Sequence, residues 1–192
     1  NSKGTGLESW LNEKGIEVKN NVVYDVSAGR VPIRQGRFIQ RINFYYYPII
    51  KNFAEHPVTT GLSNMFMPFS SELQAKGNKN LNYQVLAKTS KKSGTQQLPS
   101  QVKFQNWSEQ DFNSSNIPVA MGIEGGFGGT QQSRMVVVGC GNFIPKSEGN
   151  NQRQRRRNQI HKGNASFLVN AVDWLTDQMG LMELRTQGVS SR

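Results

Sequence analysis

A potential nucleophile stands at a turn in the stretch RMVVVGCGNFI, residues 134–144, where an apolar strand leads into Gly-Cys-Gly. Cys140 is the single cysteine of the chain. A thiol at such a turn can act as a nucleophile when a neighbouring base lowers its pKa. Two glycines after a strand can also open a phosphate-binding loop. The third interpretation is purely structural: Cys140 is a small residue at the end of a buried strand.

The rest of the sequence favours the structural interpretation of Cys140. The chain offers only His56 and His161 as histidine bases, and neither has an acidic orienter at a suitable spacing. A dinucleotide loop needs a third glycine and an immediate helix, but Ile144 and Pro145 follow instead. We therefore expect Cys140 to be buried and unreactive, and we assign no catalytic residue, no metal ligand and no cofactor.

Positive charge is the strongest chemical signal. The 192 residues include 23 Lys and Arg against 13 Asp and Glu, a formal net charge of +10, which attracts anionic partners. The densest run is RQRRRNQIHK, residues 153–162. The predicted anion or partner site consists of Arg153, Arg155, Arg156, Arg157, His161 and Lys162. No aromatic residues interleave with these arginines, which disfavours nucleic acid and leaves an anionic membrane surface or a protein partner.

The pattern of apolar residues predicts a layered α/β domain. A short amphipathic helix is expected to close at Gly15, and residues 36–50 read as a strand that ends at Pro48. Residues 118–124 and 134–140 are apolar on both faces, as is typical of central strands covered by helices. We predict a mixed or parallel sheet flanked by helices, in one domain over residues 1–192.

A last helix is expected to pack on this sheet with Trp174 buried. Its cap is Asn164 or Ser166 and its end is Gly180. The predicted apolar face comprises Phe167, Leu168, Ala171, Val172, Trp174 and Leu175. Two polar loops, 89–116 and 145–163, interrupt the predicted elements and are the expected contact segments.

Five segments together resemble one protein family. They are WLNEKGIEVKNNVVYD, FYYYPIIKNFAEHPVTTGLSNMFMPFSSEL, PVAMGIEGGF, RMVVVGCGNFI and NASFLVNAVDWLTDQMGLMELRTQGV. The most specific parts are HPV after YYYP and the closing order of Asn, apolar helix, Asp, Gly-Leu and Leu-Arg. The chain resembles the GldG-like family, the gliding-motility-associated auxiliary proteins of ABC transporters in Bacteroidetes.

The resemblance implies a periplasmic domain of a longer protein anchored in the inner membrane. Its fold would be similar to the glutamine amidotransferase or flavodoxin-like sheets, in a partial version without their catalytic residues. The implied partners are ABC permease and ATPase subunits or other envelope proteins, with an anionic membrane surface as a further possibility. The implied function is a non-enzymatic interaction domain of an ABC-transporter auxiliary component, associated with gliding motility or secretion.

Two alternatives stay open on the residues alone. One is a cysteine-dependent hydrolase or amidotransferase relative that uses Cys140. The other is a module that binds anionic surfaces or nucleic acid through the basic loop 153–162.

Overall fold

The computed structural model describes residues 6–104, 106–127, 132–144 and 160–177. The helical elements of these residues are α1 (Leu7–Glu13), η1 (Pro57–Thr59), η2 (Glu109–Asp111) and α3 (Lys162–Thr176). The strands are β1 (Ile16–Val18), β2 (Asn21–Asp25), β3 (Ala28–Gln35), β4 (Phe38–Ile50), β5 (Asn52–Phe53), β6 (Met65–Phe66), β7 (Leu73–Ala75), β8 (Leu81–Lys88), β9 (Ser93–Gln97), β10 (Pro118–Gly125) and β11 (Ser133–Val138).

The central sheet has four strands in the order β11-β10-β8-β5. Strand β10 pairs antiparallel with both neighbours, so that Met121 lies opposite Val137 on one side and Val85 on the other. Every strand pair within the described residues is antiparallel. The predicted parallel or flavodoxin-like α/β sheet is therefore wrong, and β11 is an edge strand of this sheet rather than a central one.

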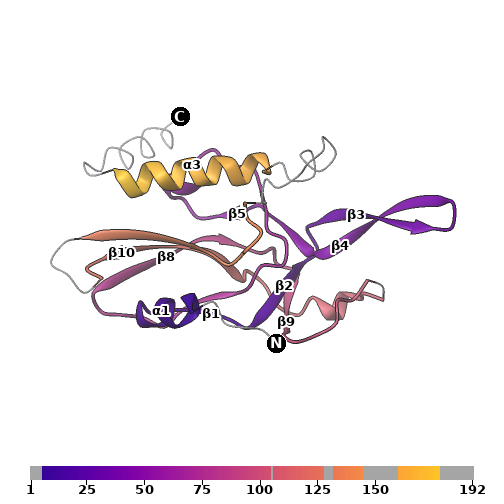
Figure 1. Cartoon of the computed structure of the whole chain (residues 1–192), viewed down its shortest axis with the longest axis horizontal. Helices are drawn as coiled ribbons and strands as arrows, with labels where there is room; N and C mark the ends of the chain where they lie inside the picture. Colours follow the sequence, from indigo (N-terminus) through magenta and orange to yellow (C-terminus); the bar gives the residue numbers. More distant parts are fainter. Residues whose placement is uncertain (1–5, 105, 128–131, 145–159, 178–192) are drawn as a thin grey trace.

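Both faces of the central sheet are nevertheless covered, as the two-sided apolar pattern predicted. Helix α3 lies over one face and α1 lies near the other (Figure 1). The α3 side contains Leu86, Val119, Phe167, Ala171 and Trp174. The opposite side contains Leu11, Ile16, Leu73, Met121 and Ile123. Two-sided burial thus has its expected cause, although the strand directions differ from the prediction.

The connection between β10 and β11 explains the antiparallel pairing. Only residues 126–132 separate the two strands. A parallel pair needs a crossover of a dozen or more residues, whereas a short connection returns the chain alongside the strand it has left. The short link therefore requires a hairpin, whatever the apolar pattern of the two strands.

Helix α3 begins and ends earlier in the sequence than predicted, and it buries a narrower face. It begins at Lys162, with His161 as its N-cap, and ends at Thr176. Trp174 is only 1% exposed, which confirms its predicted burial. The predicted apolar residues Leu168, Val172 and Leu175 are exposed instead. They lie beside the buried stripe because one face of a helix on a sheet covers only every third or fourth residue.

Asn164 fixes the start of α3 to β6 rather than capping the helix. Its buried amide nitrogen donates to the carbonyl oxygens of Phe66, at 2.8 Å, and Phe143, at 3.0 Å. Its amide oxygen accepts from the backbone nitrogen of Phe66 at 2.8 Å. A buried amide with its hydrogen bonds satisfied is well suited to specify how two elements meet.

The pair β1-β7 lies with α1 against the central sheet, and the other two sheets build the end of the molecule that carries the candidate surface. Strands β2 and β9 form one pair, and β3, β4 and β6 form a three-stranded sheet. Strand β4 runs through Pro48, where the sequence predicted its end; the carbonyl oxygen of Pro48 accepts from Met67 at 2.9 Å. The β3–β4 hairpin projects away from the central sheet (Figure 1).

Candidate interaction surface

Cys140 lies just after β11 and is held as a neutral thiol. Its side chain is buried, and its Sγ donates to the carbonyl oxygen of Pro68 at 3.2 Å. Burial raises the pKa of the thiol to about 11, although a backbone hydrogen bond from Asn142 opposes that rise. An activated cysteine has a lowered pKa. The geometry therefore supports the prediction of a structural Cys140.

Both histidines cap helical turns. His56 Nδ1 accepts from the backbone nitrogen of Val58 at 3.1 Å, and its ring packs edge-on to Trp174 with centroids 4.9 Å apart. His161 Nδ1 accepts from the backbone nitrogen of Gly163 at 3.3 Å. These bonds satisfy free N–H groups at the starts of η1 and α3 and give each ring a structural role.

The two glycines of Gly-Cys-Gly differ in how much space surrounds their α-carbons. The carbonyl oxygen of Gly139 accepts from the backbone nitrogen of Ser71 at 2.6 Å, and a β-carbon on Gly139 would overlap the Ser71 carbonyl oxygen. A β-carbon on Gly141 would meet nothing within 4 Å. Gly139 is thus required by the close approach of two chain segments. Packing explains this glycine without a phosphate-binding loop.

The predicted basic site is only partly visible. Arg153, Arg155, Arg156 and Arg157 lie outside the described residues. Lys162 is exposed at the first turn of α3, directly after His161. Both line a hollow of about 290 Å³ with residues 61–64. The six-residue anion or partner site stays a prediction.

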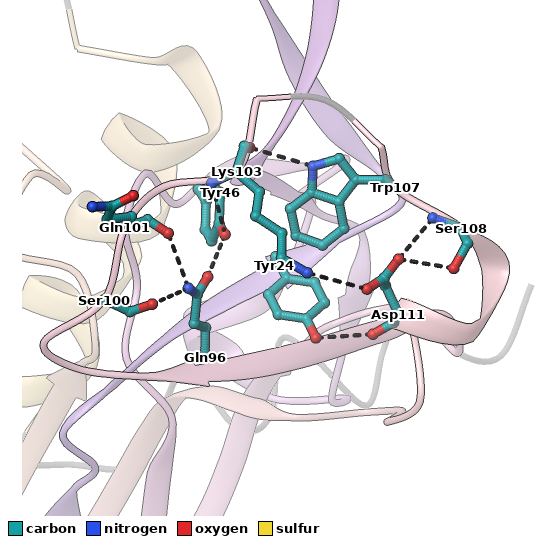
Figure 2. A network of polar contacts seen from close by, with 9 residues as sticks. All are labelled: Tyr24, Tyr46, Gln96, Ser100, Gln101, Lys103, Trp107, Ser108 and Asp111. Carbon is teal, nitrogen blue, oxygen red and sulfur yellow. Dashed lines mark hydrogen bonds and ion pairs between the residues drawn. The ribbon is translucent and has the colours of Figure 1, made fainter.

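The predicted polar loop 89–116 is folded onto the body of the protein. Part of it is strand β9, which pairs with β2. The segment that follows, residues 98–104 and 106–113, covers Tyr24 and Tyr46 (Figure 2). We call this segment, together with the rings beneath it, the aromatic shelf.

Aromatic contacts hold the shelf in place through Trp107. The centroid of the Trp107 ring lies 4.9 Å from that of Tyr24, 5.1 Å from Tyr45 and 5.5 Å from Tyr46. Phe112 stacks on it at 5.5 Å. Offset and edge-to-face pairs at such separations stabilise a cluster beyond the area that they bury. The shelf therefore has the packing of a small core.

Polar bonds fix the shelf at both ends (Figure 2). Tyr24 Oη donates to the Asp111 carbonyl oxygen at 2.8 Å, and Trp107 Nε1 donates to the Lys103 carbonyl oxygen at 3.3 Å. The Tyr46 hydroxyl bonds to the Gln96 side chain and accepts from the backbone nitrogen of Lys103. A surface fixed in this way loses little conformational entropy when a partner binds.

Ser108 and the Asp111 carboxylate close the turn that carries Trp107. Oδ2 of Asp111 accepts from the backbone nitrogen of Ser108 at 2.7 Å and from its hydroxyl at 2.9 Å. These bonds, with a smaller contribution from Lys103, lower the pKa of the Asp111 carboxyl. The carboxylate is thus ionised at neutral pH and serves the turn.

The shelf leaves one ring and one groove open to solvent. Phe104 stacks on Phe44 with centroids 5.3 Å apart, yet it is 55% exposed. A groove of about 610 Å³ separates Phe104, Asn106 and Trp107 from the β3–β4 hairpin. It is lined by Arg30, Ile33, Gln35, Gln40, Arg41, Ile42, Asn43, Tyr45, Phe104, Asn106 and Trp107. Rings, amides and two arginines suit a polar or acidic protein surface.

Sequence reasoning chose the 89–116 segment but missed the hairpin that forms the other wall of the groove. The signal was present, because residues 26–54 contain four arginines and no acidic residue. The denser arginine run at 153–157 outweighed it.

A metal site finds no support in the described part of the chain. No group of three or more His, Cys, Asp or Glu side chains there could hold a metal ion. Among the same residues, no helix has the length and apolarity to cross a membrane.

One protein family matches most of the chain. The sequence model of a family described as an ABC-type uncharacterized transport system, auxiliary type, covers residues 1–171. The chain belongs to this family. The family match confirms the predicted auxiliary role in ABC-type transport. An auxiliary role in turn supports a non-enzymatic function. The GldG-like subtype stays a prediction. No curated protein and no solved structure gives a significant match to this ABC-transporter auxiliary chain.

Proposed function

We propose that the chain is a non-enzymatic, extracytoplasmic interaction domain that docks onto the permease of an ABC-type transport system at its extracytoplasmic surface. The observation that carries this proposal is the family match over residues 1–171. The buried thiol at Cys140, with a pKa raised to about 11, adds to it, because a cysteine-dependent hydrolase or amidotransferase that used this residue would need a reactive thiol.

The aromatic shelf is the docking surface in this proposal. Interface centres favour Tyr, Trp, Phe and Arg side chains, and the groove beside Phe104 and Trp107 combines these types. Because the shelf is fixed by its own hydrogen bonds, a partner would meet a formed surface. The GldG-like resemblance supports gliding motility or secretion as the process served, with the domain on the periplasmic side of an inner-membrane anchor.

Site-specific photocrosslinking in living cells tests the docking surface. A benzophenone amino acid replaces Phe104 on the shelf or, as a matched control, Val169 on α3, which is exposed to a similar extent at 59%. We expect the probe at 104 to capture a permease subunit and the probe at 169 to capture none. Equal capture from both positions, or no transport component from position 104, would contradict the proposal.

The extracytoplasmic location has its own test. In a Cys140→Ser background, Lys79→Cys places one thiol on an exposed turn. A membrane-impermeant maleimide should label it in intact cells as strongly as after lysis. Labelling only after lysis would overturn the location.

A further inference from the structure

The free end of the β3–β4 hairpin exposes two large apolar side chains. Phe38 is 78% exposed and Ile39 is 73% exposed, at the start of β4. Successive strand residues point to opposite faces, so the apolar surface extends from both faces of the ribbon. The hairpin projects beyond the rest of the molecule (Figure 1).

A set of arginines follows the tip towards the base of the hairpin. Residues directly opposite in an antiparallel pair share a face, and the register pairs Arg30 with Asn43, Pro32 with Arg41, and Arg34 with Ile39. Arg30, Arg34 and Arg41 therefore lie along one face, and Arg37 lies beside the turn. All four are exposed.

These arginines have no carboxylate partner within the part of the chain that the structure describes. Arg30 Nε donates to Asn43 Oδ1 and Arg34 Nε donates to the Gly36 carbonyl oxygen, each at 3.2 Å. The ion pairs of the described residues all involve other cations. Four positive charges on one projecting ribbon are complementary to an anionic surface.

We propose that this hairpin inserts its tip into an anionic lipid surface, with Phe38 and Ile39 at the boundary of head groups and acyl chains and the arginines at the lipid phosphates. The spacing fits, because Arg41 lies three residues from Phe38, roughly 10 Å along a strand. Interfacial segments reach a depth of about 5–10 Å. Arg30 and Arg41 would then stand at the head groups when the tip is buried. Arg34, opposite Ile39, and Arg37, in the turn, are level with the tip, and their long side chains would reach back to the phosphates.

The two-sided tip favours lipid over a protein partner. A folded protein surface covers one face of a ribbon, which would leave either Phe38 or Ile39 in water. A fluid interface surrounds both. The basic face then adds electrostatic attraction that depends on lipid charge.

This inference goes beyond the proposed docking function and can fail independently of it. Docking concerns the aromatic shelf and a transporter subunit, whereas lipid vesicles contain no protein. The vesicle test therefore measures membrane binding without a docking partner, and the hairpin variants measure the share that the hairpin contributes to it.

Vesicle sedimentation tests the proposal with the whole chain at low ionic strength. The vesicles contain either phosphatidylcholine alone or phosphatidylcholine with about a third phosphatidylglycerol. At low ionic strength the anionic vesicles attract positive charges strongly. We expect binding to the anionic vesicles only. The double variant Arg34→Gln, Arg37→Gln should weaken it about 30-fold, and Phe38→Ser, Ile39→Ser should weaken it at least about tenfold.

Matched variants control for charge and exposure. Lys79→Gln, Lys91→Gln removes the same charge from exposed positions, and Val169→Ser, Val172→Ser removes exposed apolar side chains from α3. Both should change binding by less than about threefold. Equal thermal unfolding temperatures show that the variants are folded. The proposal is overturned if wild type does not bind, if it binds neutral vesicles equally, or if the hairpin variants bind like the controls.

A fluorescent probe tests insertion directly. Phe38→Cys in a Cys140→Ser background carries an environment-sensitive dye at the tip, and Val169→Cys carries it on α3 as the control. Emission from position 38 should shift to the blue with anionic vesicles, and emission from position 169 should not. An unchanged spectrum at position 38 would overturn insertion of the tip.

Discussion

Replacing Gly139 with alanine tests whether the Gly-Cys-Gly turn is a packing feature. The carbonyl oxygen of Gly139 accepts from the backbone nitrogen of Ser71 at 2.6 Å and from Ser70 Oγ at 3.0 Å. The backbone nitrogen of Gly139 donates to the carbonyl oxygen of Val119 at 2.9 Å. The added methyl group would overlap the carbonyl oxygen of Ser71. That oxygen belongs to the backbone, so no side-chain rotation relieves the overlap.

The expected loss of stability follows from two costs. Forcing a methyl group into an occupied position costs about 1–3 kcal/mol. Moving the segments apart also weakens two backbone hydrogen bonds at about 1 kcal/mol each. We expect Gly139→Ala to lower the free energy of unfolding by about 3–5 kcal/mol, a large share of a domain's usual stability.

Urea unfolding monitored by far-UV circular dichroism measures this loss, with two alanine variants as controls. Gly141→Ala meets no atom within 4 Å and should change stability by less than about 0.5 kcal/mol. Gly122→Ala would place its methyl group 3.5 Å from Leu86 and 3.6 Å from Trp174, an ordinary contact. It should be neutral or stabilise by up to about 1 kcal/mol. Indistinguishable midpoints for Gly139→Ala and Gly141→Ala would refute the reasoning.

Three further changes test the core, the thiol and the shelf. Trp174→Ala should cost about 3–5 kcal/mol by denaturation, while the exposed neighbour Leu175→Ala should cost less than about 1 kcal/mol; similar losses would contradict the packing of α3. Cys140→Ser should keep the fold at a cost of about 1–2 kcal/mol. Burial raises the pKa of the native thiol from 9.0 to about 11. The contribution of the neutral thiol to the free energy of unfolding is therefore complete below pH 9 and is lost as the pH rises through 11. Wild type should therefore lose about 2–3 kcal/mol relative to Cys140→Ser across that window, and a constant difference would refute the burial of the thiol. Trp107→Ala should speed amide exchange in residues 98–113 while β10 stays protected, and uniform exchange changes would contradict a locally held shelf.

Short-range signals predicted individual elements well. The apolar spacing of residues 7–13 and the glycine stop both appear in the structure, where Gly15 has a φ of +76°. The spacing of Phe167, Ala171 and Trp174 likewise predicted a helix that packs on a sheet. Such signals depend on contacts within one or two helical turns, which a sequence displays directly.

Strand direction could not be taken from apolar patterning. Residues 118–124 and 134–140 are apolar on both faces because α3 covers one side of the sheet and α1 with β1 and β7 covers the other. Coverage of this kind is common for parallel sheets but does not require them. Connection length was the better evidence, since residues 126–132 are too few for a crossover.

The candidate surface was harder to predict because its parts are distant in sequence. Tyr24, Tyr46 and Trp107 meet only after β2, β4 and the 98–113 segment have assembled. The long polar segment looked like a free loop because its few apolar anchors are widely spaced. Those anchors, Phe104, Trp107 and Phe112, contact rings of β2 and β4. Isolated aromatics in a polar segment were therefore evidence of docking onto the domain.

The same assembly explains how one small domain can present two different surfaces. Strand β4 belongs to the buried body at Phe44, Tyr46 and Ile50, and its first half is an exposed ribbon with Arg41. Strand β4 continues unbroken from Phe38 to Ile50 and so links the position of the ribbon to that of the shelf, although its pairing with β3 shifts register between Asn43 and Pro48. If the tip enters a membrane as proposed, β4 sets the distance of the groove at Phe104 and Trp107 from the lipid surface. A membrane-embedded transporter presents its extracytoplasmic surface at that level, so the two proposals place their partners on the same side of the domain.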